Sequence, residues 1–186
     1  MRIFSRFSSM DLHQYVELII EFVRTHQAWA PLIIGALAFG ESLAFISLLL
    51  PAWSVLIAMG ALIGAGALSF APVWIAAAIG AALGDWLSYW LGQKFKAPIS
   101  RIWPLSRYPD LLPRGHALIE RYGIAAIFIA RFFGPLRAAV PLVAGILEMP
   151  WWPFQIANFV SAFIWAATLL VPGMFGYDFL AKLLSF

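Results

Sequence analysis

Two arginines lie inside a long apolar run, and this placement constrains the fold more than any other feature of the sequence. The run extends from Gly123 to Leu147, and its charged residues are Arg131 and Arg137. A charged side chain at the centre of a bilayer costs about 2.5–3.5 kcal/mol even on lenient insertion scales. A pair of arginines at that depth therefore predicts an anion, a water-filled cavity or a functional role.

A helix break is predicted between the two arginines, at Gly134-Pro135. Proline lacks the backbone donor that a helix interior requires, and glycine disfavours that interior. On an unbroken helix the six-residue offset would place the two side chains about 240° apart around the axis. The break allows both guanidinium groups to face one site.

The composition predicts a membrane protein with one domain over residues 1–186. Hydrophobic residues make up 63% of the chain and charged residues 11%, far from the soluble globular range. Each span needs about 20 apolar residues, so the length allows a handful of spans and no separate soluble domain. The chain has no cysteine, and its three histidines lie outside the apolar runs. We therefore expect no metal site and no cofactor. Met1–Met10 is basic and lacks a signal-peptide pattern, so we expect no removed leader.

The first half predicts a broken helix followed by a membrane span. Residues 28–68 are apolar with one charge, Glu41, and are interrupted by Gly40 and Pro51. Such a pattern predicts a broken helix or a re-entrant hairpin, whose loose backbone must be buried in protein or face a cavity. Phe70–Gly92 has the length of one span, and its small residues recur every four positions, which is typical of close helix packing.

The remaining segments predict a surface helix, a cytoplasmic loop and a last span. An amphipathic pattern over Met10–Gln27 suits a helix lying on the membrane or an ordinary packing helix. Gln93–Tyr122 is rich in proline, which limits helix formation. It is also rich in basic residues, which predicts that it lies on the cytoplasmic side of the membrane. Pro150–Pro153 predicts an interfacial aromatic turn before the uncharged span Phe154–Tyr177.

An internal repeat connects the two apolar halves. Glu41 lies ten residues before Pro51, and Arg131 lies ten residues before Pro141. The predicted interruptions lie near Gly40–Pro51 and Gly134–Pro141. Interrupted apolar segments at matching positions are typical of transporters built from two repeats around a site near the membrane midplane. The repeats are inverted if each hairpin re-enters and one true span separates them. The predicted units are repeat one, a cytoplasmic loop and repeat two, at about 28–92, 93–122 and 123–177.

The residues of both halves follow the motifs of a known family. Its segments here are Gly40-Glu41, Pro51, Gly80-x-x-x-Gly84-Asp85-Trp86, Arg131-Phe-Phe-Gly-Pro-Leu-Arg137, Pro141, Gly145 and Phe154-x-x-x-Asn158. The arrangement covers about residues 30–175 and resembles the bacterial DedA family, also called the SNARE-associated or VTT-domain family. The resemblance implies an all-α integral membrane fold of two inverted repeats, each a re-entrant helical hairpin plus a transmembrane helix, and an activity of lipid translocation.

The resemblance also implies a cargo and an energy source. Bacterial members are linked to recycling undecaprenyl phosphate or to moving phospholipid, with a dependence on the proton motive force. In many members an acid follows the hairpin proline, but here Ala52-Trp53-Ser54 follow Pro51. Asp85 is then the intramembrane acid available to take its place.

Each buried polar residue supports two interpretations. Arg131 and Arg137 suit a planar clamp on a phosphate, and the alternative is an internal salt bridge with the two acids. Glu41 suits a proton carrier or a permanent counter-ion, and Asp85 suits a wall of the site or an anchor for helix packing. Asn158 suits a ligand contact or a bridge between helices. The other residues expected to line the pocket are Pro51, Trp53, Gly134, Pro135 and Pro141.

The sequence therefore predicts a membrane lipid transporter of the flippase or scramblase kind, and not an enzyme. The expected cargo is an anionic lipid, for which the resemblance implies undecaprenyl phosphate first and a phospholipid second, and proton coupling stays open. The alternatives are a membrane enzyme acting on lipid phosphates, which the lack of an embedded histidine disfavours, and a proton-coupled small-ion exchanger. We expect a multi-pass protein of the bacterial cytoplasmic (inner) membrane with lipid headgroups as partners, no nucleic-acid partner, and a homo-oligomer left open.

Overall fold

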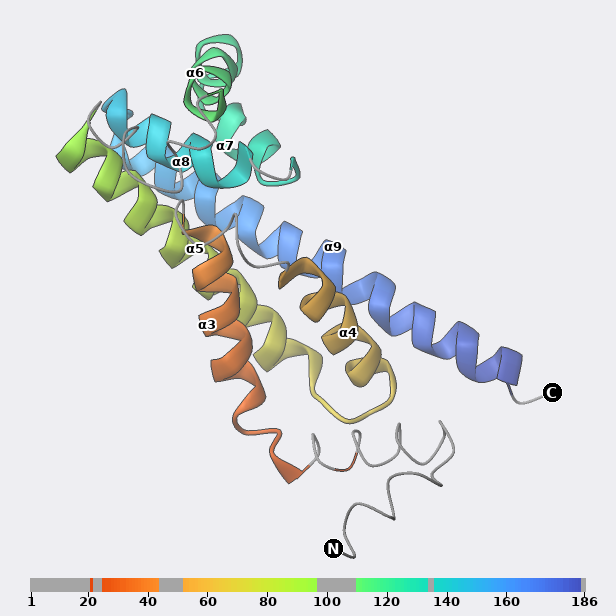
Figure 1. Ribbon diagram of the computed structural model, residues 1–186. Coiled ribbons are helices and arrows are strands. Elements are labelled where there is room, and N and C mark those ends of the chain that lie inside the picture. The colour runs from red at the N-terminus through yellow and green to blue at the C-terminus, as the bar shows by residue number, and fades with distance from the viewer. Residues whose placement is uncertain (1–20, 22–24, 44–51, 97–109, 134–135, 185–186) are drawn as a thin grey trace, which may run out of the picture.

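The computed structural model is helical over the residues that it describes, which are 21, 25–43, 52–96, 110–133 and 136–184. These residues form no strand and the following seven helices (Figure 1): α3 (Ala30–Ser42), α4 (Ala52–Gly64), α5 (Phe70–Phe95), α6 (Leu111–Tyr122), α7 (Ala125–Ala130), α8 (Leu136–Ile146) and α9 (Trp151–Leu184). The predicted cytoplasmic loop thus contains a helix, α6. The amphipathic segment expected over Met10–Gln27 lies largely outside the described residues.

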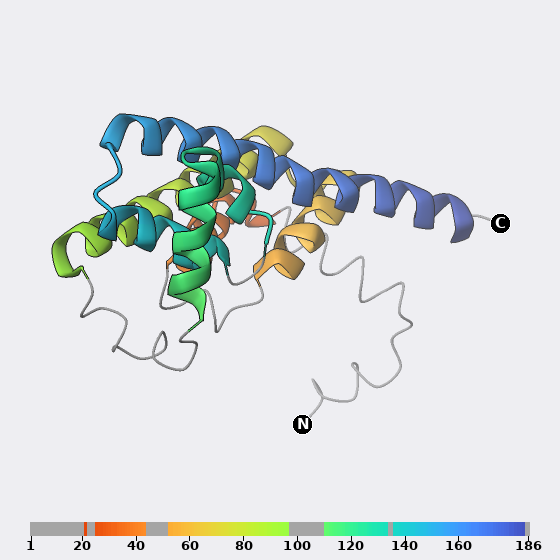
Figure 2. The same ribbon diagram turned by 90° about the horizontal axis from the view of Figure 1, so that it is seen from above.

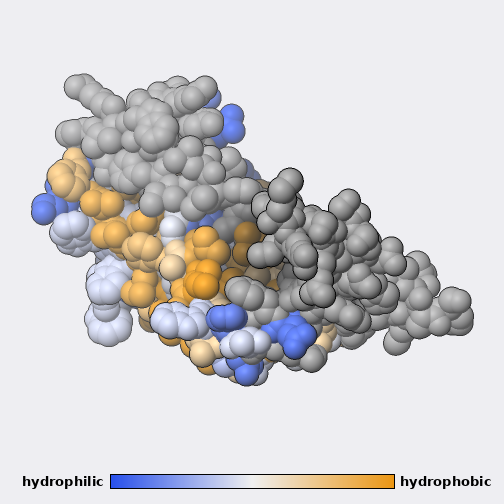
Figure 3. Space-filling view, turned by 60° about the horizontal axis from the view of Figure 1, so that its bottom comes forward, coloured by the Kyte–Doolittle hydropathy of each residue, from blue (hydrophilic) through white to orange (hydrophobic). Residues whose placement is uncertain are grey.

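Two helices, α5 and α9, are long and apolar enough to cross a membrane, over Phe70–Phe95 and Trp151–Gly176. They lie side by side and run in opposite directions, so α9 begins near the end of α5 (Figures 1 and 2). Apolar residues cover much of the described surface seen in Figure 3. On α5 the exposed apolar residues recur every three or four positions, as on a helix with one lipid-facing side. They are Ile75, Ile79, Leu83, Trp86 and Trp90, and Phe95 is exposed at the end of the helix.

Two details of the predicted helix boundaries are wrong. The turn expected at Pro150–Pro153 is instead the start of α9 at Trp151. The first backbone N–H groups of a helix have no helical partner, so a proline costs little there. Pro141 lies inside α8 and not at the break. The predicted break between the arginines is confirmed, because α7 ends at Ala130 and α8 begins at Leu136.

The other apolar helices form two pairs of short helices, α3 with α4 and α7 with α8. At 1.5 Å per residue, α3, α4 and α8 are about 17–20 Å long, and α7 is about 9 Å long. The hydrocarbon core of a bilayer is about 30 Å thick. A helix of these lengths does not cross that core alone, so each pair needs the long helices beside it.

The second helix of each short pair crosses the long helix of the other half at a pair of glycines. α4 meets α9 at Gly60 and Gly173, where a Cβ atom on either residue would lie 2.2 Å from a carbonyl oxygen of the other helix. α8 meets α5 at Gly145 and Gly92, where the corresponding distances are 2.0 and 2.1 Å. A third close approach, of Gly80 on α5 to α3, confirms the predicted small-residue packing stripe.

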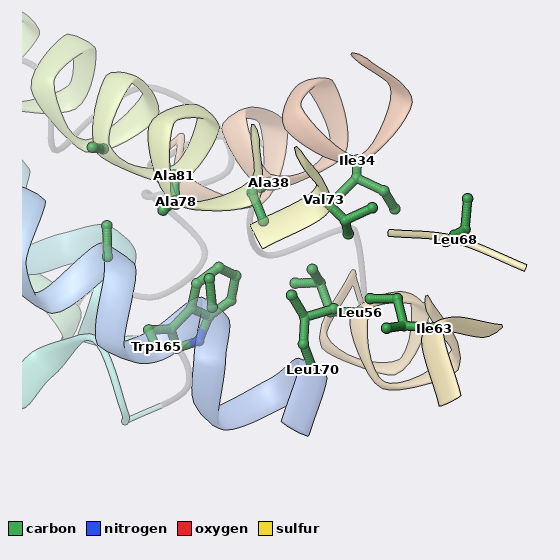
Figure 4. Close-up of a cluster of buried hydrophobic side chains, with 14 residues drawn as sticks. Ile34, Ala38, Leu56, Ile63, Leu68, Val73, Ala78, Ala81, Trp165 and Leu170 are labelled. Atoms are coloured by element: carbon green, nitrogen blue, oxygen red, sulfur yellow. The ribbon is translucent and has the colours of Figure 1, made fainter. Parts of the chain in front are cut away.

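Two large apolar clusters fill most of the interior and leave a polar belt between them. The first cluster lies among α3, α4, α5 and α9 (Figure 4). The second lies among the end of α5, the start of α9, and α6, α7 and α8. Along α5, Ala82 belongs to the first cluster and Tyr89 to the second, while buried Asp85 and Ser88 lie between them. The polar belt therefore crosses the middle of the helix assembly.

Candidate functional site

Arg131 and Asp85 form a buried ion pair in the polar belt. Arg131 directly follows α7, and its Nη2 donates to Asp85 Oδ2 on α5 at 2.5 Å. Each residue is 3% exposed. At 1.5 Å per residue, Asp85 lies about 14 Å from Lys94 and about 22 Å from Phe70 along the helix axis. The pair is therefore deep within the apolar length of α5.

Arg131 also binds two residues of α9. Its Nε donates to Ser161 Oγ at 2.9 Å, and its Nη2 donates to Asn158 Oδ1 at 2.6 Å. Asn158 in turn donates through Nδ2 to the carbonyl oxygen of Ala82 on α5 at 2.9 Å. Asn158 thus bridges the two long helices, which is one of its two predicted roles, and it also orients the arginine.

Arg137 and Glu41 form the second buried ion pair. Arg137 lies in the first turn of α8, and its Nη1 donates to Glu41 Oε1 at the end of α3 at 2.8 Å. Its Nη2 donates to Ser42 Oγ at 3.1 Å. The guanidinium carbon also lies 4.4 Å from the centre of the Trp165 ring on α9, close enough for a cation–π interaction. Three helices therefore fix the position of this arginine.

The two ion pairs form one cluster that joins the halves of the chain. Both acids belong to residues 28–92 and both arginines to residues 123–177. Arg137 also lies within electrostatic range of Asp85 and of Arg131. The internal salt bridge predicted as an alternative is therefore present in this conformation. Removing one partner of such a pair leaves an uncompensated buried charge and typically costs about 3–5 kcal/mol.

Part of this cluster has unused hydrogen-bonding capacity. Among the described residues, Arg131 Nη1, Asp85 Oδ1 and Gln155 Nε2 have no hydrogen-bond partner. A buried polar atom left in this state costs about 1–3 kcal/mol. In the described part of the chain, no group of three or more histidine, cysteine or acidic side chains is placed to hold a metal. The cluster's unused groups instead suit a ligand that makes hydrogen bonds.

A family comparison matches the larger part of the chain. The model of the VTT domain matches residues 50–175, which include α4 to α8, most of α9 and three of the four buried charges. The chain belongs to the VTT-domain family, also known as the DedA family. The predicted family is thereby confirmed, and with it a membrane protein.

Named relatives of this VTT-domain protein are bacterial membrane proteins. The inner membrane protein YabI of Escherichia coli (strain K12) is 36% identical over 157 residues, which cover 84% of this chain and 62% of YabI. The uncharacterized membrane protein BU139 of Buchnera aphidicola is 32% identical over 156 residues, covering 84% and 61%. The inner membrane protein YghB of Escherichia coli (strain K12) is 33% identical over 132 residues, covering 69% and 58%. The chain thus spans about three fifths of the length of these curated relatives. No solved structure matches it.

The fold of this VTT-domain protein brings five predicted site residues into one buried cluster. They are Glu41, Asp85, Arg131, Arg137 and Asn158. Pro141 is buried on α8, the helix that carries Arg137, and its role as a pocket wall stays a prediction. Trp53 lies in the first turn of α4, but its side chain is outside the described part of the structure. Three more predicted residues lie outside the described residues altogether, namely Pro51, Gly134 and Pro135.

Sequence reasoning missed Gln155 and Ser161, which are also buried in the cluster. Together with Asn158 they lie three residues apart on one face of α9. This spacing was visible in the sequence, since three polar residues recur at helical intervals inside an uncharged apolar span. Ser42 was missed as well, and its signal was weaker because a serine beside a charged residue is common at a helix end.

An exposed ion pair lies outside the cluster, near the end of α5. Lys96 directly follows α5, and it donates a hydrogen bond to Glu148 in the turn between α8 and α9. This hydrogen bond and the ammonium charge hold the pKa of the Glu148 carboxyl below its usual range. Tyr89 ties the same turn to α5, because its hydroxyl donates to the Met149 carbonyl oxygen at 2.5 Å. These contacts hold the start of α9 against the end of α5.

Proposed function

We propose that this VTT-domain protein moves an anionic lipid headgroup across the membrane, with the phosphate of undecaprenyl phosphate as its first candidate cargo. The observation that carries the proposal is the burial of two guanidinium groups against carboxylates inside an apolar helix assembly. Arginine offers planar, bidentate donors that match carboxylate and phosphate alike. A phosphate can therefore take the place that Asp85 or Glu41 occupies in this conformation.

The architecture that suits this activity is a pair of inverted repeats. In the proposal, α3–α4 and α7–α8 are re-entrant hairpins, and α5 and α9 are the corresponding spans. Three observations support it: the helices of both pairs are too short to cross alone, the long helices run antiparallel, and the two glycine crossings are reciprocal. The ends of the first hairpin helices, with Glu41 and Arg131, then approach the same interior site from opposite halves.

Proton exchange on the acids provides a way to release the arginines. Protonating Glu41 or Asp85 removes the charge that pairs with the guanidinium group, and the freed donors then bind the headgroup more strongly. The lipid tail stays in the bilayer while the headgroup occupies the cluster. The function needs no enzymatic step, and it places the protein in the bacterial cytoplasmic membrane with lipid as its partner.

Reconstitution into liposomes tests this function. Liposomes with undecaprenyl phosphate, with and without the protein and a pH gradient, would be assayed for headgroup accessibility from outside. Arg131→Lys and Arg137→Lys keep the charge but lose the planar fork, so each should bind and translocate the lipid at least about tenfold less well. Arg121→Lys, on the exposed side of α6, is the matched control and should behave as wild type. Wild-type transport in both cluster variants would refute the phosphate clamp.

A further inference from the structure

Gln155 is the residue of the buried cluster whose contacts least explain why its side chain is polar. It lies in the second turn of α9 and is 6% exposed. Its Oε1 accepts a hydrogen bond from Asn158 Nδ2 at 3.3 Å. Its Nε2 has no partner among the described residues. Packing alone does not require an amide here, because an apolar side chain of the same length would bury no unpaired donor.

Arg131 carries a second unpaired donor beside the same asparagine. Its Nε and Nη2 are engaged with α9 and α5, whereas its Nη1 has no partner in the described part of the chain. Asn158 connects the two residues, because its Oδ1 accepts from Arg131 Nη2 and its Nδ2 donates to Gln155 Oε1. Both residues with an unpaired donor therefore contact one side chain within the belt.

We propose that Gln155 Nε2 and Arg131 Nη1 form a two-donor subsite for one oxygen of the phosphate ligand, so that Gln155 is a further substrate-binding residue. The inference rests on the proposed function for the identity of its ligand. Two unpaired donors on side chains that share Asn158 as a partner suit an acceptor, and a phosphate oxygen has lone pairs for both. The rival occupant is a structural water, which accepts from the two donors and donates to the unpaired Asp85 Oδ1.

The stability of a Gln155 variant distinguishes a subsite that holds a phosphate or a water from a purely structural role of Gln155 in helix packing. Gln155→Met removes the amide and keeps a side chain of similar length. In that variant one N–H of Asn158 Nδ2 still donates to the Ala82 carbonyl, while the other loses its long hydrogen bond to Gln155 Oε1. The variant thus loses the unpaired Gln155 donor and leaves one Asn158 donor unpaired, so without lipid its stability should stay close to that of wild type. A residue whose task is to hold helices together would instead show a fall in stability.

The experiment measures binding and stability on the full chain in detergent micelles. Undecaprenyl phosphate is titrated, with its binding followed by native mass spectrometry, and melting is recorded without lipid. Gln155→Met should bind about tenfold more weakly, as expected for the loss of one hydrogen bond to a charged group. Gln155→Glu should bind more weakly still, since it sets a negative charge against the phosphate. Gln93→Met is the matched control, because the Gln93 amide already donates to the Tyr89 hydroxyl at 2.8 Å, outside the cluster.

The outcomes distinguish this inference from the proposed function. Weak binding in Arg131→Lys with wild-type affinity in Gln155→Met would leave the clamp intact and overturn the Gln155 subsite in favour of a water. A lower melting temperature in Gln155→Met would overturn it in favour of packing. Failure of the wild type to bind would overturn both. If inorganic phosphate competes with the lipid in wild type but not in Gln155→Met, the subsite is supported and also binds free phosphate. If lipid binding depends on Gln155 but inorganic phosphate does not compete, the subsite is supported and is specific for the lipid headgroup.

Discussion

The two halves of this protein share a helix crossing and differ in the charges that they bury. Gly60 of α4 meets Gly173 of α9, and Gly145 of α8 meets Gly92 of α5, at nearly equal approach distances. By contrast, the first half buries the acids of the cluster and the second half buries the arginines. The shared crossing sets where the backbones meet. The opposite charges then attach one half to the other, so any motion between the halves must break or exchange an ion pair.

The largest expected effect comes from breaking the shared crossing. Gly60→Ala and Gly145→Ala each place a Cβ atom 2.0–2.2 Å from a carbonyl oxygen, so a helix must move apart. We expect each variant to lose about 5 kcal/mol or more of stability, by thermal unfolding in detergent, because the backbone atoms it meets cannot turn aside as a side chain can. Gly176→Ala is the control, because a Cβ atom there meets nothing within 4 Å. A large loss at one crossing with none at the other would show that the halves are not equivalent.

The second effect tests the attachment between the halves. Asp85→Asn and Arg131→Gln each leave one buried charge without its partner, and each should cost about 3–5 kcal/mol. The double variant should be more stable than the sum of the two losses predicts, since no lone charge remains. Thermal unfolding of all four proteins gives the coupling energy, expected at about 0.5–3 kcal/mol. Strictly additive losses would mean that the pair does not join the halves.

The third effect asks which acid exchanges the proton. Glu41→Gln and Asp85→Asn remove one titrating group each and nearly keep its shape. We expect Glu41→Gln to bind the lipid but to lose its response to a pH gradient in proteoliposomes. Asp85→Asn should retain that response. If Glu41→Gln keeps its full pH dependence, then Asp85 carries the proton or transport is not coupled to protons at all.

The smallest effect concerns the exposed pair of Lys96 and Glu148. Because the folded pKa of Glu148 is lowered, the pair stabilises the protein above the ordinary pKa of 4.5. That contribution is lost as the pH falls through the lowered value. Melting curves of Glu148→Gln and wild type should therefore differ slightly at neutral pH and converge in acid. Exposed pairs contribute little, so a difference as large as that of Asp85→Asn would mean that this turn holds the halves as well.

The sequence predicts the membership of the cluster better than its pairing. Glu41, Asp85, Arg131 and Arg137 stand out because charges in apolar runs are expensive. Which acid meets which arginine depends on how α3 and α8 approach α5, and no periodic pattern encodes that approach. Glu41 and Arg131 hold matching positions in the predicted repeat, yet Glu41 pairs with Arg137 and Arg131 pairs with Asp85.

The helix boundaries, too, could be predicted from the sequence only in part. The span at Phe70–Gly92 and the break between the arginines follow from apolar length and from Gly134-Pro135. Pro141 inside α8 and Pro153 in the first turn of α9 could not be placed by composition, because proline is accepted or rejected by the local backbone. Gln155 was missed because an uncharged amide is tolerated in an apolar span, and the sequence does not show that its donor is left unpaired.

The separation of the buried acids from the buried arginines also sets a condition on biosynthesis. Glu41 is made 96 residues before Arg137, and Asp85 is made 46 residues before Arg131. At about 5–20 residues per second, the first half waits about 5–20 s for the arginine that pairs with Glu41. A carboxylate that enters the bilayer without a counter-ion takes up a proton in preference to staying charged. The newly inserted first half should therefore hold two protonated acids, and completing the second half should release their protons as the ion pairs form.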